Sequence, residues 1–426
     1  MYTIKPEGCK VPIKIWSTEG SIESEAVQQL HNAASLPFVF HHVAAMPDCH
    51  KGYGVTIGSI VATQNVVIPF AVGSDIGCGM LAVKTSLTEI TTERIKEIMT
   101  LIRKWVPVGF EHQSEAQDEN FMPKYEGNYP AMDYPIVCKE YNSALKQLGS
   151  LGSGNHFLEI QRGSDGHIWF MIHSGSRNIG LKVATHYNEL AKELNARWHS
   201  AVDPKWDLAF LPLETNEAKT YLREMNFCLE FAYANRKLMA KRIKEAFETV
   251  PCLICNGQGG KGGKKCEACD GTGIEGTGAS GAWHNVEFLE EINIHHNYAR
   301  LENHFGHNVM IHRKGATLAS DSTMGLIPGS QGTCSYVVRG KGNPDSFMSC
   351  SHGAGRKMGR KEACRSLNLQ DEIKRLNDKG IVHAIRRKED LDEAAGAYKD
   401  IDQVMAEQAD LVDIIVKLEP LAVIKG

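Results

Sequence analysis

The stretch GSDIGCG, residues 73–79, marks the place where the strand-like first part of the chain ends. Two short segments precede it, Val55 to Thr63 and Asn65 to Val72, and both are rich in β-branched residues and interrupted by Gly or Pro. Such segments predict strands. The stretch itself is therefore predicted to be a glycine-bounded turn directly after a strand, with a carboxylate at Asp75 and a thiol at Cys78.

Helices are predicted after this turn. Ile95, Ile98, Met99 and Ile102 share one helical face because they are spaced i, i+3, i+4, i+7. Further helices are predicted at 183–194, 216–249 and 401–415, strands at 167–172, 308–312 and 333–339, and a surface loop at 108–135. Gln408 interrupts the apolar stripe of the last helix, which predicts that this helix is only partly buried. Strands and helices mix without a regular βαβ rhythm, so we expect an α+β fold with one large domain over residues 1–426.

The composition limits the classes of function. Among 426 residues, 47 Lys and Arg balance 51 Asp and Glu, and the formal net charge is −4. A general polyanion binder is thereby excluded, and any nucleic-acid site must be a local patch. No apolar run is long enough to span a bilayer, and Met1 to Trp16 lacks the apolar core of a signal peptide. We therefore expect a soluble, cytoplasmic protein without membrane contact.

Four of the 12 cysteines form one short cluster. Cys252, Cys255, Cys266 and Cys269 belong to two CxxCxGxG units that a Lys/Gly loop separates. Four thiolates complete a closed tetrahedral site, which is typical of a structural zinc ion, whereas the alternative is four unpaired thiols. This unit resembles half of the zinc-binding region of DnaJ-type chaperones. It predicts one structural Zn²⁺ in a small module inserted at residues 252–280.

A second set of metal-binding side chains is spread along the chain. Each of its members stands beside Gly, Ser or Asn in a predicted turn; they are Asp75, Cys78, His156, His173 and His296. A mixed carboxylate, thiolate and imidazole set suits a divalent ion such as Mn²⁺ or Zn²⁺. Taken singly, each has a plain alternative as a buried thiol or a core histidine, and sequence spacing does not show that they meet.

A third element is the stretch CSHGAGR, residues 350–356. His352 is flanked by small residues, and the glycine amides beside it can cradle a phosphate; the alternative is an ordinary glycine turn. A basic run follows, with Arg356, Lys357, Arg360, Lys361 and Arg365, and then Arg386, Arg387 and Lys388. These residues form either the local basic patch that the charge balance requires or a solvated helix face.

Together these stretches resemble the RtcB family of GTP-dependent RNA ligases. The resemblance rests on stretches in the family's order over nearly the whole chain: MPDCHKGYG (46–54), GSDIGCG (73–79), GNHF (154–157), HSGSR (173–177), HHNY (295–298), PGS (328–330), SHGAGR (351–356) and the final Lys425-Gly426. The zinc unit departs from the simpler bacterial pattern of the family.

The resemblance implies an enzyme that joins RNA 3′-phosphate or 2′,3′-cyclic phosphate ends to 5′-hydroxyl ends, in tRNA splicing or RNA repair. It implies that His352 attacks the α-phosphate of GTP and forms a His–GMP intermediate. Asp75, Cys78, His156, His173 and His296 match the ligands of two Mn²⁺ ions, with Cys78 bridging. The positions that match the guanylate pocket are Asn155, His156, Phe157, Leu158, Glu159, His296, Asn297, Pro328, Gly329, Ser330, Gln331, Ser335, His352, Gly353, Ala354, Gly355 and Lys425.

The expected cofactors are thus GTP, two Mn²⁺ ions and one structural Zn²⁺, and an archease-like activator is a possible partner beside RNA. One alternative is a metal-dependent phosphoesterase acting on RNA ends, but such a hydrolase has no need of a nucleotide-accepting histidine. A chaperone-like binding protein is a second alternative, suggested by the zinc unit alone.

Overall fold

Two large β-sheets organise the protein in the computed structural model, which describes residues 1–126, 130–249, 260–261, 264–265 and 286–426. The six-stranded sheet has the order β1 (Tyr2–Ile4), β2 (Ile13–Ile15), β3 (Val39–His50), β4 (Ile57–Thr63), β14 (His307–Lys314) and β13 (Asn297–His304). The seven-stranded sheet has the order β12 (Phe288–His295), β6 (Gly79–Thr85), β8 (Ile168–Ser174), β7 (Phe157–Gly163), β19 (Val412–Lys425), β17 (Ser335–Gly340) and β16 (Met324–Ile327). In these two sheets every neighbouring pair is antiparallel except β2 with β3.

Three short ladders complete the strands. They are β5 (Val66–Val67) with β9 (Leu211–Pro212), β15 (Ala316–Leu318) with β18 (Ser349–Ser351), and β10 (Gly260–Lys261) with β11 (Lys264–Lys265). The helices are α1 (Ser24–Ala34), α2 (Pro69–Val72), α3 (Thr92–Trp105), α4 (Pro130–Asp133), α5 (Pro135–Gln147), α6 (Arg177–Arg197), α7 (Asn216–Glu248), α8 (Arg360–Ser366), α9 (Leu369–Asp378) and α10 (Ile401–Glu407). The mixture confirms the predicted combination of helix and sheet in one large domain.

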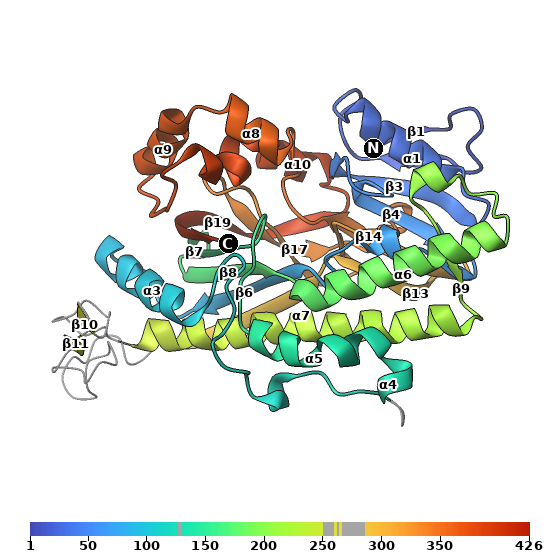
Figure 1. The fold of residues 1–426 in the computed structure, drawn as a ribbon. Helices are drawn as coiled ribbons and strands as arrows, with labels where there is room; N and C mark the ends of the chain where they lie inside the picture. Colours follow the sequence, from blue (N-terminus) through green and yellow to red (C-terminus); the bar gives the residue numbers. More distant parts are fainter. Residues whose placement is uncertain (127–129, 250–259, 262–263, 266–285) are drawn as a thin grey trace.

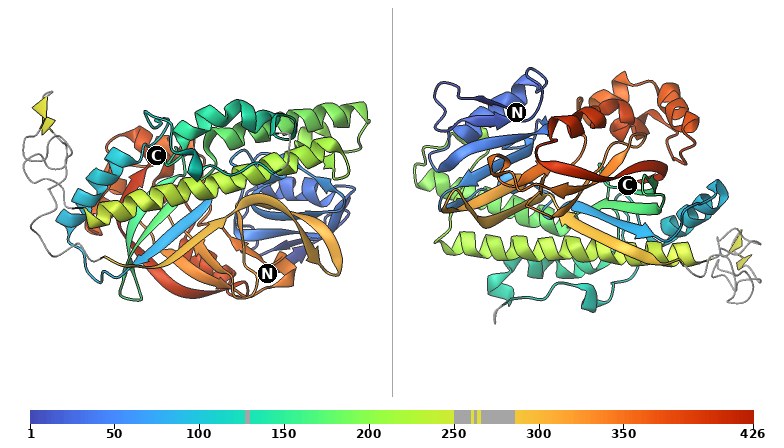
Figure 2. Two further views of the ribbon diagram at one scale, coloured as in Figure 1. Left: turned by 90° about the horizontal axis from the view of Figure 1, so that it is seen from below. Right: turned by 180° about the vertical axis from the view of Figure 1, so that it is seen from behind.

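The long helix α7 is the main support of both sheets (Figures 1 and 2). It begins at a Thr215 cap that accepts a hydrogen bond from the Ala218 amide, and it packs beside α6, with α5 on its outer side. Met225 and Phe231 of α7 are buried in one apolar cluster with Met310 of β14, while Met239 and Ile243 pack against the seven-stranded sheet. One continuous apolar helix face therefore fixes the position of the strands that carry the site.

The predicted helix with Ile95, Ile98, Met99 and Ile102 is α3, and all four side chains are buried. Two other predictions need correction. The segment 65–72 forms only the short strand β5 before Pro69 begins α2, because proline is favourable in the first turn of a helix.

The predicted helix 401–415 is wrong beyond Glu407. The helix α10 ends there, and β19 begins at Val412 and pairs with β17 and β7. The β-branched residues of this segment fit a strand because β17 offers a partner along 412–414. The helix α10 is partly buried, as predicted, with Asp402, Gln403 and Ala406 exposed. Gln408 itself is fully buried, and its Oε1 accepts a hydrogen bond from the Ser351 amide at 2.9 Å. Of the helices in the described part of the chain, none has the length and apolar character needed to cross a membrane.

Candidate active site

One end of the seven-stranded sheet collects the predicted metal ligands. In the ladder, Gly79 pairs with His295 on one side and with Ser174 on the other, and Phe157 pairs with His173 and with Lys425. Cys78 precedes β6, His156 precedes β7, and His296 follows β12. His173 belongs to β8 itself rather than to the turn after it. Residues far apart in the chain therefore meet because their strands are neighbours with a fixed register.

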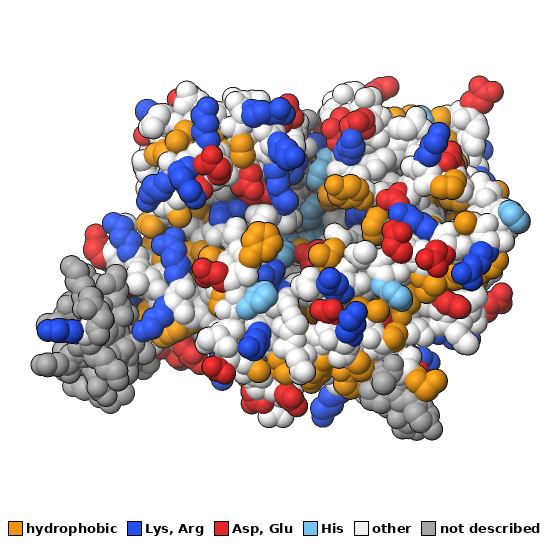
Figure 3. All heavy atoms as spheres, viewed as in Figure 1, with side chains coloured by type: hydrophobic (Ala, Val, Ile, Leu, Met, Phe, Trp, Pro, Cys, Tyr) orange, Lys and Arg blue, Asp and Glu red, His pale blue; other side chains and the backbone are white. Residues whose placement is uncertain are grey.

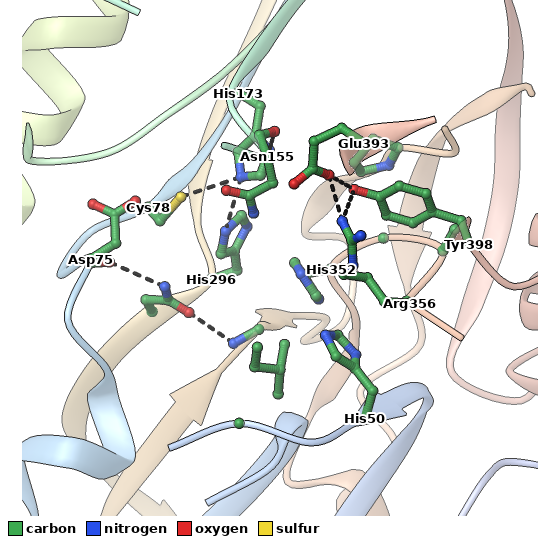
Figure 4. A pocket seen from close by; sticks show the side chains of 18 of the residues that line it. His50, Asp75, Cys78, Asn155, His173, His296, His352, Arg356, Glu393 and Tyr398 are labelled. Atoms are coloured by element: carbon green, nitrogen blue, oxygen red, sulfur yellow. Dashed lines mark hydrogen bonds and ion pairs between the residues drawn. The ribbon is translucent and has the colours of Figure 1, made fainter. Parts of the chain in front are cut away.

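The ligand atoms form two groups that share the Cys78 thiol. The Cys78 Sγ lies 3.2 Å from His173 Nε2, and His173 Nε2 lies 3.3 Å from His296 Nε2. On the other side, Cys78 Sγ lies 3.5 Å from His156 Nε2, which lies 2.9 Å from Asp75 Oδ2. Each group can hold one metal ion with its ligand atoms within 4.8 Å of one another. Figure 4 shows Cys78, His173 and His296 pointing toward a common centre.

The outer ring nitrogens of two ligands are held by backbone carbonyls. His156 Nδ1 lies 2.9 Å from the Leu151 oxygen, and His173 Nδ1 lies 3.0 Å from the Asn155 oxygen. A proton on each Nδ1 leaves the Nε2 lone pair free for a metal ion. Burial lowers the pKa of His173 and of His296, and the neighbouring positive groups lower it further. Neutral imidazole donors beside a thiol and a carboxylate fit a divalent transition-metal ion.

A buried arginine that the sequence analysis missed supports these ligands. Arg236 of α7 is fully buried, and its Nη1 donates to the carbonyl oxygens of Gly77 at 3.0 Å and Ser174 at 2.8 Å. Its Nε donates to Asn293 Oδ1 at 2.8 Å. This cation therefore joins the turn before Cys78 to β8 and β12. Its position within a helix-periodic stretch gave no sign of this contact.

His352 lies next to the metal-ligand cluster but belongs to a different part of the fold. It follows β18, and its ring centre is 4.8 Å from that of His296. Its Nδ1 lies 2.6 Å from Asp48 Oδ2, which also accepts from the His352 amide at 3.1 Å. Although burial opposes ionisation, the charge and hydrogen bond of His352 keep the pKa of Asp48 below its usual value. Asp48 thus orients the imidazole, and in the neutral ring with its proton on Nδ1 the unprotonated nitrogen is Nε2.

A cavity of about 640 Å³ brings the metal ligands, His352 and most of the predicted guanylate positions together. This size suits a nucleotide-sized ligand. The predicted residues on its wall are Asp75, Cys78, Asn155, Phe157, Glu159, His173, His296, Asn297, Pro328, Gly329, Ser330, Gln331, His352, Gly353, Ala354, Gly355 and Lys425. Figure 3 shows the hollow in the middle of one face with histidine side chains inside it, and Lys and Arg gathered toward α8, α9 and α3.

Three predicted pocket residues lie behind this wall. His156 belongs to the ligand cluster, and Ser335 Oγ accepts from the Gly329 amide at 3.3 Å and from Gln161 Nε2 at 3.2 Å. The Leu158 side chain packs in an apolar cluster with Ile172, on the face of β7 that points away from the cavity. Strand alternation explains this difference, since Phe157 and Glu159 face the cavity.

An ion-pair cluster on the cavity wall was also missed. Glu393 is buried, and it accepts from Arg356 Nη1 at 2.8 Å, from Arg360 Nε at 2.7 Å and from the Tyr398 hydroxyl. Arg356 and Arg360 of the predicted basic run therefore form ion pairs with a buried carboxylate rather than a free surface patch. Burial raises the pKa of Glu159, on the same wall, to about 8, although Gln161 donates a hydrogen bond to it. The four cysteines of the predicted zinc unit lie outside the described residues.

The fold and the site together define a metal-binding enzyme with a nucleotide-sized cleft and an oriented histidine. Comparison with known proteins agrees with this class of enzyme. The profile of the family described as tRNA-splicing ligase RtcB matches residues 29–253 and 277–426. The chain is 37% identical over 430 residues to RNA-splicing ligase RtcB of Escherichia coli (strain K12), covering 97% of each protein.

Two further relatives extend the comparison. The chain is 30% identical over 487 residues to tRNA-splicing ligase RtcB of Thermococcus kodakarensis, covering 98% of this chain and 95% of that protein. It is 32% identical over 469 residues to RNA-splicing ligase RtcB homolog 1 of Entamoeba dispar, covering 94% of this chain and 82% of that protein. The chain therefore belongs to the RtcB family, and the prediction of an RNA ligase is confirmed.

Proposed function

We propose that this RNA ligase joins an RNA 3′-phosphate end to a 5′-hydroxyl end through a covalent guanylate on His352. The imidazole Nε2 attacks the α-phosphorus of GTP, and pyrophosphate leaves. The guanylate then passes to an oxygen of the RNA 3′-phosphate as the P–N bond breaks. The 5′-hydroxyl finally attacks that activated phosphorus, and GMP leaves. A 2′,3′-cyclic phosphate enters the same route after opening by water.

The observation that carries this proposal is the Asp48–His352 pair on the wall of the cavity. The 2.6 Å contact at Nδ1 places the ring proton on the side away from the reaction and leaves a nucleophilic Nε2. The glycine-rich turn 353–355 follows on the same wall, where backbone amides can meet phosphate oxygens. A plain phosphoesterase needs no such oriented nucleophile.

Two Mn²⁺ ions are part of the proposal. Asp75, Cys78 and His156 would hold one, and Cys78, His173 and His296 the other, with the thiolate shared. When bound, such ions neutralise charge on a phosphoryl group and on its leaving group. The fully buried Arg236 keeps the shared turn in place. The oriented imidazole rings and buried thiol need no rearrangement to act as ligands.

The guanylate pocket is proposed on the wall from Phe157 and Glu159 to Lys425. Glu159 offers a carboxyl group to a base edge, and the Lys425 Nζ lies 5.7 Å from the centre of the Phe157 ring. The turn 328–331 lies on the same wall, and Gln331 Nε2 is anchored on the Glu393 carbonyl oxygen at 2.9 Å. These contacts would fix the positions of the side chains that bind the guanine base and its phosphates.

We further propose that Cys252, Cys255, Cys266 and Cys269 bind one structural Zn²⁺ in a small insert at residues 252–280. The family match leaves residues 254–276 unmatched, which supports an insertion at this place. Four thiolates prefer Zn²⁺ to Mn²⁺. We also propose an archease-like activator as a partner and a cytoplasmic location, and both rest on the resemblance to the RtcB family.

The test of the main proposal is incubation with Mn²⁺ and GTP labelled at the α-phosphate, followed by a denaturing gel. Acid-labile, alkali-stable label should appear on the wild-type protein and be absent from His352→Ala. That variant should still join RNA supplied with a 3′-guanylate, because this step follows the lost one. His307→Ala, which removes an exposed histidine outside the cavity, is the matched control. Normal labelling of His352→Ala would refute the assignment.

A further inference from the structure

One wall of the active-site cavity takes no part in the chemistry described above. It consists of the loop between β3 and β4 and the turn at α2, and it includes Lys51, Tyr53, Phe70 and Ser74 together with Lys314 at the end of β14. The metal ligands, His352 and the proposed guanylate wall lie outside this set. An enzyme that joins two RNA ends must hold the nucleotides at those ends as well as the guanylate, so this wall is available for RNA.

Tyr53 is the exposed aromatic side chain of this wall. Its side chain is 80% exposed although it borders a deep cavity. Among the residues that the structure describes, its ring has no hydrogen bond and no aromatic neighbour. A single exposed apolar residue is ordinary on a protein surface. An unpartnered aromatic ring at the edge of an RNA ligase cavity calls for a more specific explanation.

The backbone that carries Tyr53 is held firmly. Gln29 bonds both sides of Gly52, with its Nε2 at 2.7 Å from the carbonyl oxygen and its Oε1 at 3.0 Å from the amide. The buried Lys314 donates to the Tyr53 carbonyl oxygen and, at 3.1 Å, to that of Phe70. Gly54 has φ +71°, and a Cβ there would lie 2.9 Å from the Asp207 oxygen. The loop is therefore tied to three neighbouring segments while the ring itself stays free.

A fixed backbone with a free aromatic ring is the arrangement that nucleobase stacking requires. Proteins recognise unpaired RNA bases by stacking them on aromatic side chains, and with the backbone already fixed only the side-chain rotamer has to be ordered on binding. Lys314 does not need to touch RNA in this arrangement, because it acts as a positioning residue that links the Tyr53 loop to the α2 turn.

We propose that Tyr53 is a stacking platform for an unpaired terminal nucleobase of an RNA end entering the cavity. The inference rests on the proposed joining of RNA ends and adds the residue that holds one of them. The same chemistry serves the base at a 3′-phosphate end and the base at a 5′-hydroxyl end. An unpaired base at either end has a free face for stacking.

The test uses RNA with 2-aminopurine as the terminal base at the 3′-phosphate end in one probe and at the 5′-hydroxyl end in another. Each probe is titrated into the protein without GTP, and both fluorescence and anisotropy are followed. Stacking should quench one probe in the wild-type protein and in Tyr53→Phe. Tyr53→Leu should lose the quenching and bind that probe about tenfold more weakly, as expected for one lost stack. The quenched probe identifies which RNA end Tyr53 holds.

A matched control is Phe121→Leu, which removes another exposed aromatic ring that lies outside the cavity. It should behave as wild type. Equal quenching and affinity for both probes in the wild-type protein and Tyr53→Leu would overturn the inference. Label transfer from α-labelled GTP to the wild-type protein is measured in parallel. Its absence would count against the guanylylation route itself, whereas normal label with no effect at Tyr53 would refute only the stacking platform.

Discussion

Replacing Asp48 by Asn should slow guanylylation of His352 without disturbing the fold. The carboxylate is fully buried, and its Oδ2 accepts both from His352 Nδ1 at 2.6 Å and from the His352 amide at 3.1 Å. The other oxygen, Oδ1, has no hydrogen-bond partner among the described residues. An asparagine can therefore keep its oxygen toward His352 and place its amide group where Oδ1 was. The variant then loses the charge but keeps the orientation of the ring.

The size of the effect follows from the bond that is weakened. A hydrogen bond to a charged partner contributes about 1.5–3 kcal/mol. Since each 1.36 kcal/mol in the barrier is about tenfold in rate, the first-order rate of guanylylation should fall about ten- to 150-fold. Asp48→Ala should fall further, because it also removes the acceptor that sets the tautomer.

Single-turnover labelling with saturating α-labelled GTP, quenched at short times, measures this rate directly. Asp345→Asn is the matched control, because it removes a carboxylate whose ion pair with Lys14 lies outside the cavity. Thermal unfolding of both variants checks the fold. A rate for Asp48→Asn within twofold of wild type would show that Asp48 does not orient His352 for attack.

Three other changes test separate parts of the site. Cys78→Ser should lose both Mn²⁺ ions rather than one, since both ligand groups share this thiol and a hydroxyl is a poorer bridging ligand. Metal analysis of the purified protein measures the loss, and retention of one tightly bound ion would contradict the shared thiolate. In the folded protein the pKa of Glu159 is about 8, above the ordinary 4.5, so the folded state holds an extra proton between these pH values and the free energy of unfolding falls as pH rises through this range. Glu159→Gln should remove this part of the pH dependence. Urea unfolding at pH 5.5 and 8 measures it, and an unchanged difference between the two pH values would count against the prediction. Replacing Cys252 and Cys255 by Ser should release one zinc ion and leave labelling of His352 intact; loss of labelling in the folded double variant would show that the insert supports the active site.

Much of the site could be predicted because its residues stand in distinctive short stretches. Asp75, Cys78 and His352 lie beside glycines, where tight turns bring side chains and backbone amides to a ligand. The sequence could not show that these stretches meet. Their meeting depends on strand order and register, as in the pairing of Gly79 with Ser174 and His295, and these are long-range features.

The residues that were missed have a common character. Arg236 and Glu393 look in sequence like ordinary charged residues of a helix and a loop, yet both are buried as hubs of hydrogen bonds. Periodicity also failed at 412–415, where β-branched residues fit either an apolar helix face or a strand. The sheet decided the outcome there, since β17 offered a pairing partner to Val412, Asp413 and Ile414.

The short ladder of β15 with β18 explains how the proposed nucleophile His352 and the candidate metal ligand His296 keep a fixed separation. The Ala316 amide donates to the His296 carbonyl oxygen at 3.2 Å, and Ala316 pairs with Ser351, the residue before His352. On the other side, Gln408 holds the Ser351 amide, so the strand end is fixed from two directions. Phosphoryl transfer requires the nucleophile and the charge-neutralising groups in one alignment, and an error of about 1 Å can cost about 100-fold in rate. Placing His296 and His352 at the same end of one hydrogen-bonded ladder, beside the Ala316–Ser351 pair, supplies that alignment from the backbone, and not from flexible side chains.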